Sequence, residues 1–245
     1  MEKMADDNEI AIDRDALTAA GVVDPAQALR NLDLVRRRIS ADSAGRFFLD
    51  DLVALRRAGD PDMALNNLER FVAGLTDPAA FDAACSRTVS LLSSLITVFG
   101  ASRFLSAFLL FDPDGSVRLL GDPYFIHAPE RERLAQTLAA ATEQDPDEHA
   151  FFRSLRQFRK REMLRIALRD LTGRTDLAGT VSELSDLAEV CIERAHAWAD
   201  RELRNRHGRP LHLCDDGTAA PAGLAVIGMG KLGGCELNFS SDVDL

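Results

Sequence analysis

The sequence predicts a mainly α-helical chain that ends in a short α/β element. Three observations support this fold class. Asp-Pro pairs recur where helices would start, apolar residues recur at helical spacing, and two short apolar stretches after Gly208, residues 211–214 and 224–228, predict strands. We expect a flexible tail over residues 1–23, a helical region over 24–207 and the start of a further domain over 208–245.

Asp-Pro pairs mark the expected helix starts, because an aspartate side chain accepts the orphan N–H groups of a first turn and proline fits its first position. The pairs begin at Asp24, Asp60, Asp77 and Asp145. A buried helical stripe is expected from apolar residues at steps of three and four. Its members are Cys85, Val89, Leu92, Ile96 and Phe99. Residues 111–120 instead carry a turn signal at Asp112 to Gly115 and predict a short hairpin.

One expected helix, over residues 151–171, is rich in arginine. Its seven cations are Arg153, Arg156, Arg159, Lys160, Arg161, Arg165 and Arg169. In a chain of net charge −10, they suit either a solvated helix face or a surface for a nucleotide phosphate or an acidic partner. The second interpretation allows a non-catalytic helical interaction module. The acidic balance argues against nucleic acid as a partner, because binding its backbone needs a basic surface.

The cysteines and the amino terminus predict a cytoplasmic protein. Cys85, Cys191, Cys214 and Cys235 lie far apart, which fits neither a zinc site nor a disulfide framework and suggests a reducing compartment. The first residues are acidic and lack an apolar signal segment, and no apolar run has the length needed to span a bilayer. We therefore expect no membrane partner.

Two chemistries compete for the last stretch, VIGMGKLGGCELNFSSDVDL, residues 226–245. Residues 228–233 fit the G-x-G-x-x-G dinucleotide fingerprint and follow an expected buried strand, as in a Rossmann oxidoreductase. That fold also needs an apolar helix after the third glycine and an acidic residue about 20 positions further on. Here a polar, turn-prone segment follows and the acids arrive early, so this alternative explains fewer residues.

Metal-dependent nucleotidyl transfer explains more of the stretch. In an extended strand, Asp242 and Asp244 would share one face while Val243 and Leu245 face the core, so both carboxylates would be placed to bind Mg²⁺. Such ions neutralise phosphate charge and orient the reacting oxygens. The glycine turn lets backbone N–H groups approach a phosphate. The candidate phosphate-binding residues are Gly230, Lys231, Gly233, Gly234, Ser240 and Ser241.

The segment GMGKLGGCELNFSSDVDL resembles the signature of the glutamine synthetase adenylyltransferase/deadenylylase family, part of the DNA-polymerase-beta-like nucleotidyltransferase superfamily. Gly230, Asp242 and Asp244 match the superfamily pattern of a glycine turn followed by D-x-D. The upstream segments ALNNLERF and LRQFRKREMLRIALRDL also resemble helices of this family. The resemblance implies that residues 208–245 are the truncated start of a polymerase-beta-like nucleotidyltransferase fold.

The resemblance also implies an activity. Such enzymes attach AMP from ATP to a tyrosine of glutamine synthetase and remove it by phosphorolysis, which releases ADP. PII-type signal proteins and glutamine regulate them. Because the chain starts with methionine and reads ELNFSSD, it is similar to the amino-terminal, AMP-removing half. In that half, Asp242 and Asp244 are the implied catalytic Mg²⁺ ligands.

Two departures from the family pattern qualify this expectation. Cys235 occupies a position that is usually arginine, and the chain stops at Leu245, before the strand that would supply a third carboxylate. We therefore expect an incomplete domain with little or no turnover.

Overall fold

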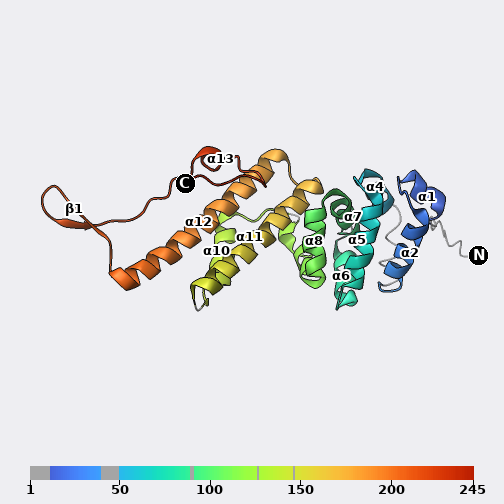
Figure 1. Ribbon diagram of the computed structural model, residues 1–245, viewed down its shortest axis with the longest axis horizontal. Helices are drawn as coiled ribbons and strands as arrows, with labels where there is room; N and C mark the ends of the chain where they lie inside the picture. Colours follow the sequence, from blue (N-terminus) through green and yellow to red (C-terminus); the bar gives the residue numbers. More distant parts are fainter. Residues whose placement is uncertain (1–11, 40–49, 89–90, 126, 146) are drawn as a thin grey trace, which may run out of the picture. The chain divides into compact units, whose positions relative to one another are not determined.

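The computed structural model describes residues 12–39, 50–88, 91–125, 127–145 and 147–245. This part of the chain is mainly helical, as predicted, with one two-stranded sheet (Figure 1). It divides into two compact units. Unit 1 comprises Met1–Ile126 and Leu171–Arg174, and unit 2 comprises His127–Asp170 and Thr175–Leu245.

Unit 1 is built from short helices. They are α1 (Arg14–Ala19), α2 (Pro25–Arg36), α4 (Asp50–Arg57), α5 (Pro61–Ala73), α6 (Pro78–Arg87), α7 (Leu91–Ala101), α8 (Arg103–Phe111), α9 (Pro113–Leu120) and the 3-10 turn η1 (Pro123–Phe125). Helix α5 packs against α2 and α7, and α6 packs against α9. Phe71, Phe81 and Phe99 are fully buried, and the ring centroids of Phe81 and Phe99 lie 5.9 and 5.7 Å from that of Phe71.

Asp-Pro pairs start helices as predicted at Asp24, Asp60 and Asp77, where each aspartate accepts the N–H of the residue three positions on at 2.9, 2.8 and 3.1 Å. The hairpin predicted over residues 111–120 was wrong. Asp112 accepts the Gly115 N–H at 2.8 Å and starts α9. The physical reason is that aspartate followed by proline satisfies a first helical turn as well as a tight turn.

Three other expectations change in detail. Residues 14–19 form α1, with Leu17 buried, inside the segment expected to be a flexible tail. The expected apolar stripe is divided between α6 and α7. Cys85, Leu92, Ile96 and Phe99 are buried as predicted, while Val89 lies outside the described residues. Pro146 also lies outside them, and the Ala150 N–H near the start of the next long helix donates to Asp147 rather than Asp145.

Among the described residues, no single helix is long and apolar enough to cross a membrane. Helices α6 and α7 would meet that requirement only as a pair, by length and composition, and they are bent by 107°.

Unit 2 places the C-terminal motif against long helices. Its elements are α10 (Arg131–Thr142), α11 (Glu148–Leu171, up to Asp170), α12 (Leu177–His207), β1 (Leu211–Leu213), β2 (Ala219–Pro221) and α13 (Gly230–Gly233). Helix α12 packs against α10, and its Trp198 stacks on Phe151 of α11 with ring centroids 4.9 Å apart. The strands pair antiparallel with His212 opposite Ala220, and the chain then returns along α12 (Figure 1).

A buried ionic network joins α11 to α12. Arg165 contacts Glu162 at 2.7 Å and Glu183 at 2.6 Å, and Arg169 contacts Glu183 at 3.1 Å. The four side chains are 3–10% exposed. Each buried charge therefore has a partner, as the high cost of desolvating an unpaired charge requires.

Two predicted strands are not formed. Residues 224–228 have no strand, and Leu224 and Ile227 are 72% and 69% exposed rather than buried. Residues 242–245 also lack a strand, and Val243 and Leu245 are exposed rather than facing a core. A strand requires a partner strand for its backbone N–H and C=O groups, and neither segment pairs with one among the described residues. The domain boundary near residue 208 stays a prediction.

Candidate nucleotide and metal site

The glycine-rich turn is held on unit 2 by two leucines. Leu232 within α13 and Leu237 just after it are 3% and 6% exposed, and both belong to a core cluster with residues of α10, α11 and α12. Burial of each leucine contributes about 2 kcal/mol. The turn therefore has a fixed position relative to its supporting helices.

A buried hydrogen bond adds a polar anchor. Ser185 of α12 is 2% exposed, and its Oγ donates to the Val181 carbonyl at 2.8 Å. The same oxygen accepts the Leu237 N–H at 3.2 Å. Since this N–H is buried, the serine removes the cost of leaving it unpaired. Sequence reasoning missed Ser185, because it lies 52 positions before the residue that it holds.

Glycine is favoured at position 230 by its backbone conformation and required at position 233 by a close backbone contact. Gly230 has a φ of +54°, in the left-handed region that favours glycine. A Cβ at Gly230 would lie 3.3 Å from the Asp244 carboxylate, and one at Gly233 would lie 2.6 Å from the Gly228 carbonyl oxygen. The turn thus depends on glycine for both its conformation and its close contacts.

The structure brings Asp244 next to the glycine turn. The Met229 N–H donates to the Asp244 carbonyl at 2.9 Å, and an oxygen of the Asp244 carboxylate lies 3.3 Å from the place where a Gly230 Cβ would be. Asp242 is exposed on the surface. Since the expected strand is not formed, a shared face for the two carboxylates stays a prediction.

The amides of Gly233 and Gly234 are used inside the turn. Their N–H groups donate to the carbonyls of Met229 and Gly230, each at 3.1 Å. These two residues therefore close the turn, and their predicted contribution to phosphate binding does not come from free N–H groups. Cys235, the departure from the family pattern, is exposed and has a φ of +56°.

Asn238 organises the polar residues between the turn and the aspartates. Its Oδ1 accepts the Ser240 N–H at 3.1 Å and the Ser241 hydroxyl at 2.8 Å. Lys231 Nζ in turn donates to Ser241 Oγ at 3.4 Å. Three predicted residues are thus connected through an asparagine that sequence reasoning missed. Asparagine accepting an N–H two residues on is a known local turn signal, so it was available in the sequence.

A cavity of about 280 Å³ lies between the turn and α12. Its lining residues are Glu189, Ile192, Glu193, Val226, Gly228, Leu232, Gly233 and Leu245. The two glutamates form ion pairs with Arg131 of α10. The hydrogen bond from Arg131 to Glu193 raises the pKa of the guanidinium, so this wall of the cavity carries one arginine charge against two glutamates.

The carboxylates of Asp242 and Asp244 fit an open Mg²⁺ site, in which water supplies the other ligands. Among the described residues, no three His, Cys, Asp or Glu side chains are grouped so as to hold a metal ion. Mg²⁺ commonly keeps several waters and uses only one or two protein carboxylates. Asp244, beside the turn, and the exposed Asp242 therefore suit this ion better than a metal that needs a closed protein cage.

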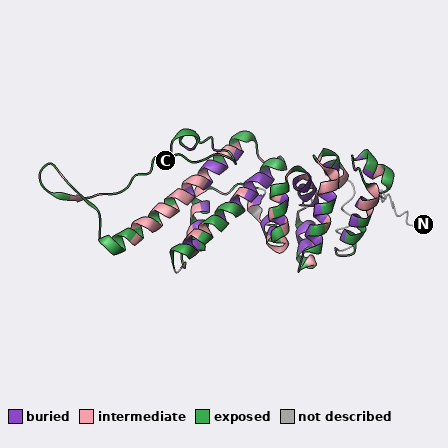
Figure 2. Cartoon of the chain, in the orientation of Figure 1, coloured by how far each residue is buried: buried purple, intermediate pink, exposed green. Residues whose placement is uncertain are grey.

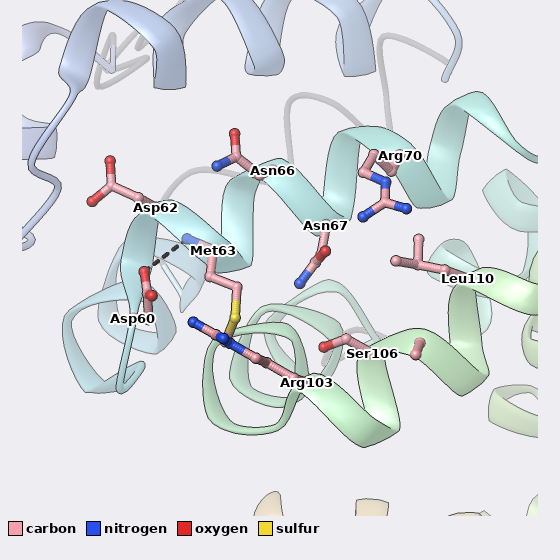
Figure 3. Close-up of a pocket in the computed structure, with 10 residues that line it drawn as sticks. Asp60, Asp62, Met63, Asn66, Asn67, Arg70, Arg103, Ser106 and Leu110 are labelled. Atoms are coloured by element: carbon pink, nitrogen blue, oxygen red, sulfur yellow. Dashed lines mark hydrogen bonds between the residues drawn. The ribbon is translucent and has the colours of Figure 1, made fainter.

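A second, larger cavity belongs to unit 1. It is a groove of about 490 Å³ between α5 and α8 of unit 1 (Figure 3). Asp60 at its edge caps α5, and Asp62 accepts the N–H groups of Val23 and Asp24 at 2.8 and 2.9 Å. None of the predicted site residues lines it. Asp60 and Asp62 thus hold the start of α5 and the segment before α2 in place.

Comparison with known proteins identifies the protein family of the chain. Residues 92–245 match the family model described as glutamate-ammonia ligase adenylyltransferase. Relatives include the bifunctional glutamine synthetase adenylyltransferase/adenylyl-removing enzyme of Thioalkalivibrio sulfidiphilus, which is 41% identical over 169 residues. The proteins of Pseudomonas aeruginosa and Shewanella loihica carry the same name and are 44% identical over 119 residues and 36% over 151.

The chain belongs to the glutamate-ammonia ligase adenylyltransferase family. The aligned segments cover 67%, 49% and 62% of this chain but only 17%, 12% and 15% of these three relatives. The chain is thus far shorter than the proteins it matches. The resemblance drawn from the terminal motif is confirmed, and the dinucleotide-binding alternative is not favoured.

Proposed function

We propose that the chain supplies part of a nucleotidyltransferase site that removes AMP from an adenylylated tyrosine of glutamine synthetase. One observation carries the proposal: the Asp244 carboxylate lies against Gly230 of a glycine turn, within the residues that match an adenylyltransferase family. The relatives are named for both adenylyl transfer and adenylyl removal. Residues 208–245 are then the start of a polymerase-beta-like nucleotidyltransferase fold.

Each residue of the motif has a role in this proposal. Asp242 and Asp244 hold Mg²⁺, which when bound neutralises phosphate charge and orients the reacting oxygens. Lys231 adds a positive charge beside the phosphate, and its hydrogen bond with Ser241 directs the ammonium group along the turn. Gly230 and Gly233 keep the surface free of side chains. The buried leucines and Ser185 hold this arrangement on α12.

The reaction is an exchange at one phosphorus atom. An oxygen of inorganic phosphate forms a bond to the phosphorus of the tyrosyl-AMP ester, and the bond from that phosphorus to the tyrosine oxygen breaks. The products are ADP and a tyrosine whose oxygen takes up a proton. ATP-dependent adenylylation and control by a PII-type protein belong to the same proposal, on the strength of the family resemblance.

The isolated 245 residues are expected to turn over little substrate. No three His, Cys, Asp or Glu side chains of the described residues are grouped to hold a metal ion, whereas nucleotidyl transfer uses ions that orient both reacting oxygens. Completion of the site therefore depends on residues from outside this chain's motif.

A chimera tests the proposal. This chain replaces the 41% identical segment of the Thioalkalivibrio relative, and phosphate-dependent ADP formation from adenylylated glutamine synthetase is measured. We expect activity in the chimera and a loss of at least about 100-fold in its Asp242→Asn/Asp244→Asn variant, since both metal ligands are removed. The variant's unfolding midpoint serves as the folding control.

Nucleotide binding separates the two enzyme classes in the same protein. Mg²⁺-dependent ADP binding that the double variant loses supports the proposal. If the chimera is folded but forms no ADP, or if the double variant is as active as its parent, the proposal is wrong. Binding of a nicotinamide dinucleotide that the double variant retains would instead revive the oxidoreductase alternative.

A further inference from the structure

The first half of α11 carries exposed cations that have no ion-pair partner in the described part of the chain. Arg153, Arg156 and Lys160 follow a spacing that places them on one helix face, and Arg159 lies beside them. All four are exposed, and none takes part in the ion pairs found among the described residues. We call these four residues the cationic stripe.

Some other arginines of unit 2 have acidic partners, whereas Arg133, Arg206 and Arg209 have none among the ion pairs of the described residues. Arg131 pairs with Glu189 and Glu193, and Arg204 pairs with Asp200 at 2.7 Å. In a chain with 39 acidic against 29 basic residues, counter-ions are plentiful. Like charges three and four positions apart also destabilise a helix by a few tenths of a kcal/mol per pair, roughly. The stripe therefore differs from single exposed arginines because it gathers four cations within eight residues of one helix.

We propose that the cationic stripe docks an acidic surface of the protein substrate. The identity of that substrate, glutamine synthetase, rests on the proposed function. The argument from charge does not depend on it. Four neighbouring cations attract an acidic surface and speed its association, an effect that salt weakens. A protein partner is favoured over nucleic acid, because the net charge of −10 repels an extended phosphate backbone.

The arginines suit a protein partner for a further reason. Guanidinium groups bind carboxylates through two parallel hydrogen bonds, which gives orientation as well as attraction. Arg153 and Arg156 lie one helical turn apart. They therefore match carboxylates spaced by about one turn on an acidic helix or by two residues on a strand.

Charge reversal with a matched control tests the stripe. Arg153→Glu/Arg156→Glu/Lys160→Glu is compared with Arg133→Glu/Arg206→Glu/Arg209→Glu, which changes the net charge equally at exposed positions of the same unit. Each protein, as the full 245-residue chain, is titrated against glutamine synthetase by surface plasmon resonance at low and at physiological salt. Circular dichroism and thermal unfolding confirm that both variants are folded.

We expect the stripe variant to bind at least about 10-fold more weakly than the parent, mainly through slower association, while the control changes affinity by less than about 2-fold. The parent's affinity should fall with added salt. Equal losses in both variants, no loss in the stripe variant, or no binding by the parent would overturn the proposal. So would a short single-stranded RNA that binds the parent more tightly than glutamine synthetase and loses binding in the stripe variant.

The docking proposal and the proposed function can be contradicted independently of each other. Asp242→Asn/Asp244→Asn in the chimera should remove ADP formation while leaving docking intact. Unchanged docking by the stripe variant, together with aspartate-dependent activity of the chimera, would remove the stripe proposal alone.

Discussion

The two halves of α11 carry the same residue type in opposite environments. In the second half, Arg165 and Arg169 are buried and pair with glutamates. In the first half, Arg153 and Arg156 are exposed and have no ion pair in the described part of the chain. Figure 2 shows both buried and exposed residues along this helix.

The difference comes from a second helix rather than from the local sequence. Glu183 of α12 contacts both buried arginines, and it lies 18 positions after Arg165. No such acid is paired with the stripe among the described residues. From the sequence alone, a run of arginines is therefore compatible with two roles, a buried ion pair or an exposed charged surface. Only the position of the partner helix decides between them. Because Arg165 supports the core, a test of the interaction-module hypothesis has to change the exposed arginines of α11 instead.

The largest expected effect contrasts the two halves directly. Arg165→Gln leaves Glu162 buried without its partner, so we expect the free energy of unfolding to fall by about 3 kcal/mol. Arg156→Gln on the same helix should change it by less than about 0.5 kcal/mol, because that side chain is exposed. Urea denaturation of both variants measures the difference. Similar losses at both positions would mean that the two halves are not energetically distinct.

The next effect concerns the anchor that α12 provides two residues after Glu183. Ser185→Ala leaves the buried Leu237 N–H without its acceptor, and we expect a loss of about 1–2 kcal/mol. Hydrogen exchange at the Leu237 amide should accelerate more than exchange in the middle of α12, since the loss is local. Ser240→Ala, at an exposed position of the same segment, is the control. Unchanged protection of Leu237 would show that the leucines alone hold the motif.

Sequence reasoning succeeded where the physical rule is local. The helix starts at Asp24, Asp60 and Asp77 follow from capping, which involves residues three positions apart. The sequence motif also placed Gly230 near Asp244, and the two residues do lie close together, while their roles in binding stay a prediction. The same local rule, applied to Asp112, would also have found α9.

It failed where a distant partner decides the outcome. The strand expected over residues 224–228 has no neighbouring strand among the described residues, and an apolar run carries no information about that neighbour. The support from Ser185 and Glu183 likewise depends on contacts across 52 and 18 positions. The attachment of the glycine turn to α12 could therefore not be predicted from the sequence, and the roles of the site residues stay a prediction.

The smallest expected effect concerns Asp186 of α12 and tests whether this acid, like Glu183, contributes to stability. Asp186 is half-buried, and burial, followed by the charge of Glu189, raises the pKa of its carboxyl above the ordinary value of 3.8. Arg131 acts in the opposite direction. Because the folded state holds the proton more tightly than the unfolded state, the ionised carboxylate costs stability above the raised pKa. That cost disappears as the pH falls through the raised pKa toward 3.8.

Asp186→Asn should therefore raise the unfolding temperature at pH 7, and the advantage should vanish by about pH 4. Much of the side chain is solvated, so screening keeps the gain below about 1 kcal/mol. Thermal unfolding across this pH range measures it, with Asp215→Asn at an exposed position as the control. A variant that is less stable than its parent at pH 7 would show that Arg131 outweighs burial, and that Asp186 belongs with the stabilising acids of α12.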